Sequence, residues 1–100
     1  PSLMRMALLD PETKDALFAI PHLMVGGEAM PLTLAEELAN RAHGTLTNMY
    51  GPTETTIWSS THRFARDPKN VPLGRPIVNT QLYVLDRFRQ PVPILSLIHI

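Results

Sequence analysis

The order of apolar segments and glycines between residues 23 and 51 constrains the fold most strongly. Residues 23–25 form a short apolar run before Gly26-Gly27, which is typical of a buried strand that ends in a loop. Residues 31–44 indicate a helix, with apolar side chains four residues apart, acidic residues early and a glycine at the end. Residues 45–49 then indicate a second strand. This order predicts a βαβ unit with two parallel strands, and so an α/β fold.

Patterns outside this unit extend the prediction. Leu3, Met6 and Leu9 recur at helical spacing, which predicts a core helix over residues 1–9 that stops at Asp10-Pro11. Extended structure is expected at residues 55–64 and again as a strand at residues 80–85. A polar loop is expected at residues 67–72 and a turn at residues 86–90.

The two glycine-containing loops are expected to meet. Parallel neighbouring strands place their carboxyl ends on one edge of the sheet, where open α/β sheets bind ligands. Residues 26–29 and residues 50–54 each follow one of the two strands. The sequence therefore predicts a binding site built from both loops.

Composition excludes several classes of function. Nine Lys and Arg balance nine Asp and Glu and are scattered, which argues against a nucleic-acid surface or a polybasic membrane anchor. Apolar runs are too short for the roughly 18 residues of a membrane span, and no signal-like start is present. The chain has no cysteine, so disulfides and Cys-ligated zinc are excluded. We expect a cytoplasmic protein that binds neither membrane nor nucleic acid.

A tight polar loop follows the second expected strand and carries residue types suited to a nucleotide. Tyr50 can stack on a base, Gly51 allows close backbone approach and Pro52 stiffens the turn. Thr53 can donate a hydrogen bond to a phosphate oxygen, and Glu54 can offer a hard oxygen ligand to Mg²⁺. On these residue types alone, a polar turn with Tyr50 packed in the core is the commoner alternative.

The order of residues in this loop is more specific than their types. The string Asn-Met-Tyr-Gly-Pro-Thr-Glu at residues 48–54 resembles the adenylate-forming enzyme superfamily, and most closely the adenylation domains of nonribosomal peptide synthetases. It matches their Asn-x-Tyr-Gly-Pro-Thr-Glu motif at every specified position. Four further segments agree: residues 26–30, 72–77, 83–86 and 90–93. The resemblance covers residues 1–94 and implies a partial AMP-binding domain.

The resemblance implies both a fold and a reaction. The chain would be a fragment of the large N-terminal subdomain of such an enzyme, an α/β unit running into the start of a β-rich subdomain. The enzyme would join an amino-acid carboxylate to the α-phosphorus of ATP, release pyrophosphate and pass the aminoacyl group to a phosphopantetheine thiol. ATP and Mg²⁺ are the implied cofactors. A peptidyl carrier protein and neighbouring synthetase domains are the implied partners.

The resemblance also implies roles for individual residues. The residues that match the family's adenosine-binding positions are Gly27, Glu28, Ala29, Asn48, Met49, Tyr50, Gly51 and Thr53. In the family, the Tyr50 match stacks on adenine and the Thr53 match contacts the α-phosphate. Thr53 and Glu54 are the implied catalytic residues, and Glu54 is the implied Mg²⁺ ligand. Such groups stabilise charge that develops on phosphate oxygens.

A second set of positions concerns the amino-acid substrate. By resemblance, the residues that line its side-chain pocket are Met24, Gly26, Met49, Ile57 and Trp58. Large apolar groups leave room for only a very small side chain and offer no partner to a charged one. The pattern is similar to that of glycine-activating domains. Cysteine-activating domains are the near neighbour, usually with Ser in place of Gly26.

Other parts of the family's site have no match in these residues. They are the upstream phosphate loop, the aspartate that pairs with the substrate amine, the aspartate that holds ribose and the lysine of the C-terminal subdomain. Two alternatives therefore stay open, an acyl- or aryl-CoA ligase of the same superfamily and an inactive truncated fragment. Residues 95–100 also depart from the family pattern. The codons CTG TCT CTT ATA CAC ATC would encode them and match a sequencing-library adapter, so we expect a non-native tail.

Overall fold

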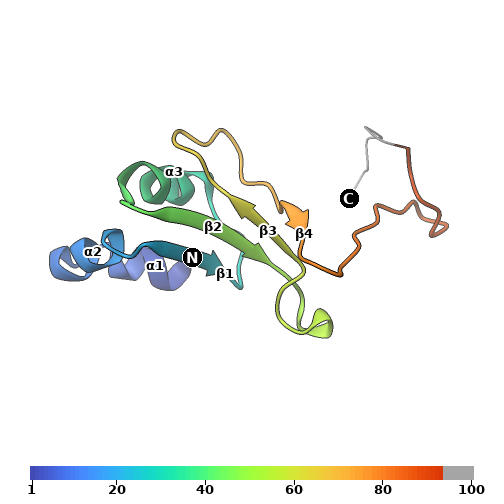
Figure 1. Ribbon diagram of the computed structural model, residues 1–100, viewed down its shortest axis with the longest axis horizontal. Helices are drawn as coiled ribbons and strands as arrows, with labels where there is room; N and C mark the ends of the chain where they lie inside the picture. Colours follow the sequence, from blue (N-terminus) through green and yellow to red (C-terminus); the bar gives the residue numbers. More distant parts are fainter. Residues whose placement is uncertain (94–100) are drawn as a thin grey trace.

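A computed structural model describes residues 1–93 of the chain. In this part of the chain, two short helices, α1 (Ser2–Ala7) and α2 (Pro11–Phe18), precede a mixed sheet with strand order β1-β2-β3-β4 (Figure 1). The bounds of the other elements are β1 (His22–Gly26), α3 (Leu32–Arg41), β2 (Thr45–Tyr50), η1 (Thr53–Thr55), β3 (Ser60–Arg63) and β4 (Arg75–Pro76). None of the helices described is long and apolar enough to cross a membrane.

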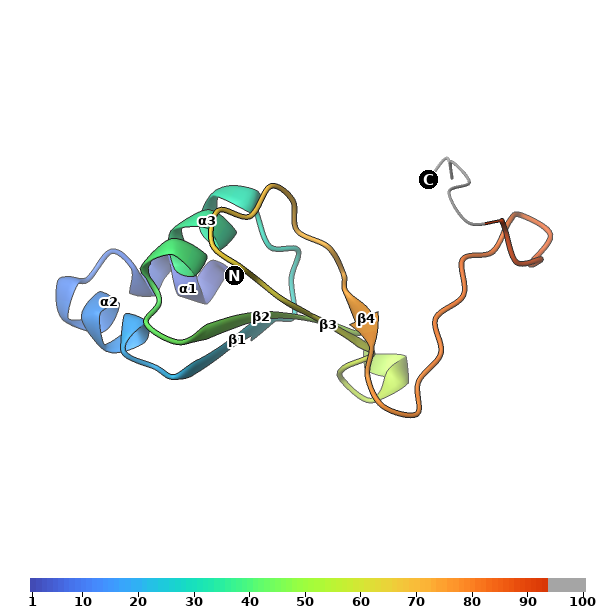
Figure 2. The same cartoon turned by 45° about the horizontal axis from the view of Figure 1, so that its top comes forward.

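The predicted βαβ unit is confirmed. Strands β1 and β2 pair in parallel, with Val25 opposite Asn48 and Gly26 opposite Met49. Helix α3 connects them and lies over one face of the sheet (Figure 2). The buried apolar side chains of this face and of the helices form one core: Leu17, Phe18, Leu23, Val25, Met30, Leu34, Ala35, Leu38, Leu46 and Phe64.

The other face of the sheet carries side chains that the helices do not cover. Along β1, burial alternates, so Leu23 and Val25 are buried whereas Met24 is 64% exposed. Met49 on β2 lies on this second face because it is opposite Gly26 in the register. Parallel strands are normally covered on both faces. In the described residues, however, only one face of this sheet is packed, since Met24 on the other face is exposed.

The N-terminal helix is present, but its predicted place in the core is wrong. Leu3 is 76% exposed and Leu9 is 85% exposed, and α1 has no buried residue. Only Met4 and Leu8, on another side of this segment, pack against the core. The apolar spacing of Leu3, Met6 and Leu9 therefore marks a face that no described residue covers.

Helix α2 is an element that the apolar pattern did not predict. Asp10 caps its first turn, because the Asp10 carboxylate accepts hydrogen bonds from the Thr13 backbone N–H at 3.0 Å and the Thr13 hydroxyl at 2.6 Å. Pro11 then occupies the first turn, where its missing N–H costs nothing. Asp10-Pro11 thus ends one helix and begins the next, and the capping signal was available in the sequence.

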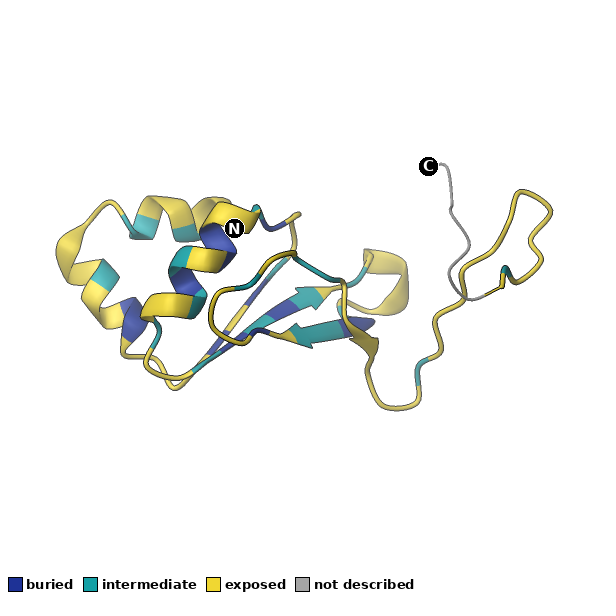
Figure 3. Ribbon diagram, turned by 90° about the horizontal axis from the view of Figure 1, so that it is seen from above, coloured by how far each residue is buried: buried dark blue, intermediate teal, exposed yellow. Residues whose placement is uncertain are grey.

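Two predicted strands differ in the structure. Within residues 55–64 only β3 is a strand, because Thr56 and Ile57 adopt left-handed backbone angles, with φ of 59° and 81°, and reverse the chain. Residues 80–85 form no strand, apart from a single bridge between Leu85 and Pro91. These residues are largely exposed (Figure 3), since no described strand lies beside them.

The loop and turn predictions are confirmed. Residues 67–72 form an irregular loop between β3 and β4. Residues 86–90 form a turn in which the Asp86 carboxylate accepts hydrogen bonds from the backbone N–H groups of Phe88 and Gln90, at 2.8 Å and 2.9 Å. The predicted non-native tail, residues 95–100, lies outside the described residues and stays a prediction.

Candidate functional site

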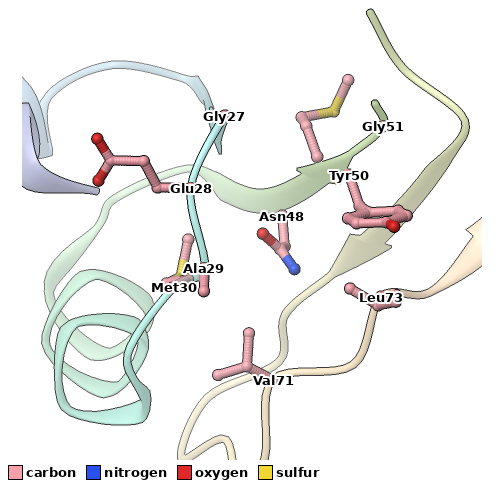
Figure 4. Close-up of a pocket in the computed structure, with 10 residues that line it drawn as sticks. Gly27, Glu28, Ala29, Met30, Asn48, Tyr50, Gly51, Val71 and Leu73 are labelled. Atoms are coloured by element: carbon pink, nitrogen blue, oxygen red, sulfur yellow. The ribbon is translucent and has the colours of Figure 1, made fainter. Parts of the chain in front are cut away.

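A pocket of about 320 Å³ lies at the carboxyl ends of β1 and β2 (Figure 4). The sequence predicted a binding site at this edge, built from the loops at residues 26–29 and 50–54. Three segments line it: the loop from β1 to α3, the end of β2, and part of the loop before β4. The lining residues are Gly27, Glu28, Ala29, Met30, Asn48, Met49, Tyr50, Gly51, Val71 and Leu73. All the residues expected around adenosine line this pocket except Thr53.

Tyr50 is not packed in the core. Its side chain is 43% exposed and forms part of the pocket wall, near Leu73 (Figure 4). The alternative of a polar turn with a buried tyrosine is therefore wrong. A half-exposed ring beside a pocket leaves one surface free for a planar ligand.

Asn48 is the most deeply buried polar group of the pocket, with 5% exposure. Its amide nitrogen, Nδ2, donates a hydrogen bond to the backbone carbonyl of Pro72 at 3.1 Å. Because a carbonyl oxygen only accepts, this contact fixes which end of the amide is nitrogen. The amide oxygen then faces the loop from β1 to α3 (Figure 4), where it can accept a hydrogen bond from a bound ligand.

Glu28 belongs to the lining loop but directs its carboxylate away from the pocket (Figure 4). Its Oε2 accepts hydrogen bonds from the Ser2 hydroxyl at 2.5 Å and from the Ser2 backbone N–H at 3.2 Å. These hydrogen bonds hold the pKa of Glu28 below its usual value. The Glu28 carboxylate therefore ties this loop to the start of α1.

Thr53 and Glu54 lie in η1, which begins two residues after the pocket-lining Gly51. The loop is closed at its base, since the backbone N–H of Ser59 donates to the Tyr50 carbonyl at 2.8 Å. Thr55 adds two contacts, with its hydroxyl 3.0 Å from the Pro52 carbonyl and 2.5 Å from the Ser59 hydroxyl. The structure thus fixes the loop that carries Thr53 and Glu54 at the edge of the pocket.

Glu54 itself is exposed and has no hydrogen bond or ion pair among the described residues. Residues 1–93 contain no group of three or more His, Cys, Asp and Glu side chains that could hold a metal ion. A metal at Glu54 would therefore need its other ligands from outside these residues, such as phosphate oxygens of a bound molecule or water. That coordination suits Mg²⁺, which proteins often bind through one or two carboxylates together with phosphates.

The residues expected to line the substrate pocket are only partly brought together. A Cβ atom on Gly26 would lie 2.7 Å from the Trp58 ring and 2.4 Å from the Met49 carbonyl oxygen, so these three residues are in close contact. Met24 lies on the same face of β1, two residues earlier, and is exposed. Ile57 is also exposed, in the left-handed part of the loop.

Met30, Val71 and Leu73 line the pocket but were not predicted as site residues. Met30 directly follows the expected loop, so a prediction one residue longer would have included it. Leu73 lies in a segment that matched the family pattern, but Val71 lies in a loop that was predicted only to be polar. Sequence spacing gives no indication that residues 71–73 return to the end of β2.

Comparisons with known proteins agree with this geometry. A family model described as AMP-binding enzyme matches residues 1–95. A dimodular nonribosomal peptide synthase of Bacillus subtilis (strain 168) is 54% identical over 73 residues, which are 72% of this chain and 3% of that protein. Tyrocidine synthase 3 of Brevibacillus parabrevis is 38% identical over 86 residues, 79% of this chain and 1% of that protein.

A solved structure shares the arrangement of elements. It is the crystal structure of the Vibrio cholerae adenylation domain AlmE in complex with glycyl-adenosine-5'-phosphate, with a TM-score of 0.70 and 26% identity. The match covers 93% of this chain and 19% of that chain. The chain therefore spans a small part of each of these relatives.

The chain belongs to the family of AMP-binding enzymes. Within that family it resembles the adenylation domains of nonribosomal peptide synthetases, as its motif at residues 48–54 predicted. The predicted fold class, a fragment of the N-terminal α/β subdomain of such a domain, is confirmed.

Proposed function

We propose that this chain is part of an adenylation domain that joins an amino acid to ATP and forms an aminoacyl-adenylate and pyrophosphate. The observation that carries the proposal is the pocket at the ends of β1 and β2, which gathers both family-matching loops around one cavity. Its volume of about 320 Å³ lies at the low end of small-molecule sites. ATP would place its adenine there and its phosphates toward Thr53 and Glu54.

The chemistry of the pocket suits adenine. The exposed face of Tyr50 offers stacking, and Val71 and Leu73 add an apolar wall. The amide oxygen of Asn48 can accept a hydrogen bond from the exocyclic amine of the base, because its amide nitrogen is already engaged by Pro72. Guanine carries a carbonyl at the corresponding ring position, so this arrangement favours adenine.

We assign the binding of the ATP phosphates to Thr53 and Glu54. The Thr53 hydroxyl would donate to an α-phosphate oxygen, and Glu54 would hold Mg²⁺ together with phosphate oxygens. The metal would supply positive charge where negative charge develops during displacement of pyrophosphate. The chain's own part is to fix these groups on the closed loop from residue 50 to residue 59.

We propose glycine as the amino acid. Gly26, Met49 and Trp58 are in close contact on the uncovered face of the sheet and leave little room beside the ring. These residues carry no charge to balance an acidic or basic substrate. The glycyl-adenosine-5'-phosphate bound to AlmE supports the same choice. Cysteine is the nearest competitor.

The aminoacyl group would then pass to the phosphopantetheine thiol of a peptidyl carrier protein, which the name of the Bacillus subtilis relative supports. A CoA ligase would instead transfer it to free coenzyme A. Neighbouring synthetase domains would be the other partners. The use of ATP fits the cytoplasmic location that the sequence predicts.

The test is amino-acid-dependent ATP–pyrophosphate exchange by a complete domain that contains this chain, with a panel of amino acids. Glycine should give the fastest exchange, and a preference for Phe, Leu or a charged amino acid would refute the substrate assignment. Product analysis with coenzyme A and with a carrier protein separates the two acceptors. No exchange with any amino acid or simple carboxylic acid would refute the adenylating activity.

A further inference from the structure

One wall of the pocket is a loop segment that two buried polar side chains hold against the sheet. We call residues 71–74 the strap. Val71 and Leu73 of the strap line the pocket. Asn48 donates to the carbonyl of Pro72 at 3.1 Å, and the Ser60 hydroxyl donates to the carbonyl of Leu73 at 2.7 Å. The strap is thus attached to β2 and to β3 through consecutive carbonyl groups.

Ser60 is placed to hold the strap but not to contact a ligand. It is fully buried, with 0% exposure, and its side chain is absent from the pocket lining. It lies on β3 opposite Tyr50 in the register, which brings the strap close to the end of β2. Its hydroxyl is satisfied by Leu73 alone among the described residues.

Gly74 allows the strap to lie close to β3. Its φ is +87°, which side-chain-bearing residues rarely adopt, and a Cβ atom would lie 1.9 Å from the Thr61 carbonyl oxygen. The strap therefore follows the backbone of β3 immediately before β4 pairs with that strand. A side chain at position 74 would therefore force the strap and β3 apart.

We infer that Ser60 is a positioning residue of the pocket, acting through the strap. Its hydrogen bond to the Leu73 carbonyl holds the Val71 and Leu73 side chains as a preformed apolar wall. The inference rests on the proposed function, in which this wall contacts adenine. A ligand that meets a loose strap must order it on binding, so the affinity for ATP falls while the reacting groups stay in place.

The experiment compares Ser60→Ala with the unmodified protein in a complete domain that contains this chain. We expect the KM for ATP to rise about tenfold, the effect of one lost hydrogen bond, with kcat and the KM for the amino acid nearly unchanged. Hydrogen exchange at the amides of Val71, Leu73 and Gly74 should become faster in the absence of ATP. Thr47→Val is the matched control, because it removes a hydroxyl from the opposite face of β2 that has no hydrogen bond among the described residues.

A second variant acts on the strap without touching the buried hydroxyl. Gly74→Ala should raise the KM for ATP in the same way, because its Cβ would push the strap away from the Thr61 carbonyl oxygen. Ser60→Cys keeps the size of the side chain but is only a weak donor, and it carries the test of Ser60 if Ser60→Ala does not fold. An unchanged KM for ATP, or a lower kcat with both KM values unchanged, would overturn the inference. If the unmodified domain neither binds nor uses ATP, the proposed function fails. If the unmodified domain uses ATP and the Ser60→Ala variant has the same KM for ATP, only the role of Ser60 is refuted.

Discussion

At the scale of single residues, the site contains side chains that face the pocket and side chains that hold others in place. Tyr50 presents a half-exposed ring to the pocket. The amide nitrogen of Asn48 binds the strap, which leaves its amide oxygen for a ligand. Glu28, although part of the lining loop, is used to bind Ser2. Residue type alone does not distinguish these roles, because they depend on where each side chain points.

Replacement of Glu54 tests the proposed metal ligand. Glu54→Gln keeps the size of the side chain but removes its charge, so we expect the rate of adenylate formation to fall by roughly 10² or more. Single-turnover kinetics at saturating Mg²⁺ would measure this step. Glu36→Gln, an exposed glutamate on α3, is the control and should have no effect. An intact rate in Glu54→Gln would show that Glu54 is not the metal ligand.

Replacement of Tyr50 tests the proposed adenine contact. Tyr50→Ala should weaken ATP binding by about 1 to 3 kcal/mol through lost stacking, with a smaller effect on kcat. Tyr50→Phe keeps the ring and should bind ATP almost normally, since the Tyr50 hydroxyl has no hydrogen bond among the described residues. Titration with ATP or a non-hydrolysable analogue would separate the two variants. Equal losses in both would argue against stacking.

At the scale of elements, the sequence predicted what depends on local pattern. β1, α3 and β2 follow from apolar spacing and flanking glycines, and their parallel order follows from the connecting helix. The strand expected at residues 80–85 has the right alternation but no neighbouring strand among the described residues. The strap was not predicted as a pocket wall because its position depends on contacts with Asn48 and Ser60 far away in the sequence.

The cap of α2 gives a prediction for pH. Hydrogen bonds from the Thr13 side chain and backbone keep the pKa of Asp10 below its usual value in the folded state. Because these hydrogen bonds favour the charged Asp10 carboxylate, they stabilise α2 at neutral pH. This stabilisation is lost as the pH falls from about 4, the usual pKa of Asp, through the lower pKa of the folded state.

Asp10→Asn can still cap the helix but does not titrate. Hydrogen exchange of the α2 amides, compared between the two proteins at each pH, should show similar protection at pH 7. In acid, α2 should lose more protection in the unmodified protein than in the variant. The same acid dependence in both proteins would contradict the role of the Asp10 charge.

At the scale of the whole molecule, the described residues form a sheet with one packed face. Helix α3 covers one side, whereas Met24 on the other side is exposed. The chain corresponds to 19% of the AlmE adenylation domain, so the family fold contains much more structure than these residues. The motifs that the family resemblance implies for binding the ribose, the substrate amine and the phosphates also have no match in this sequence.

Activity of the polypeptide of residues 1–100 alone is therefore expected to be absent. Because about half of the family's site is missing, ATP binding should be negligible. Because one face of the sheet is uncovered, the polypeptide should tend to aggregate. Calorimetric titration with ATP, pyrophosphate exchange and light scattering would measure these properties. A complete domain containing the same residues is the positive control. Glycine-dependent exchange by the short polypeptide would show that the missing motifs are dispensable.

The contact between Gly26 and Trp58 also sets an order for evolutionary change. A side chain acquired first at position 26 would meet the Trp58 ring at 2.7 Å. A smaller residue acquired first at position 58 leaves a cavity, which costs stability but causes no clash. Lineages that came to accept larger substrates should therefore have replaced Trp58 before Gly26. The later change at position 26 would still require β1 to shift away from the Met49 carbonyl oxygen.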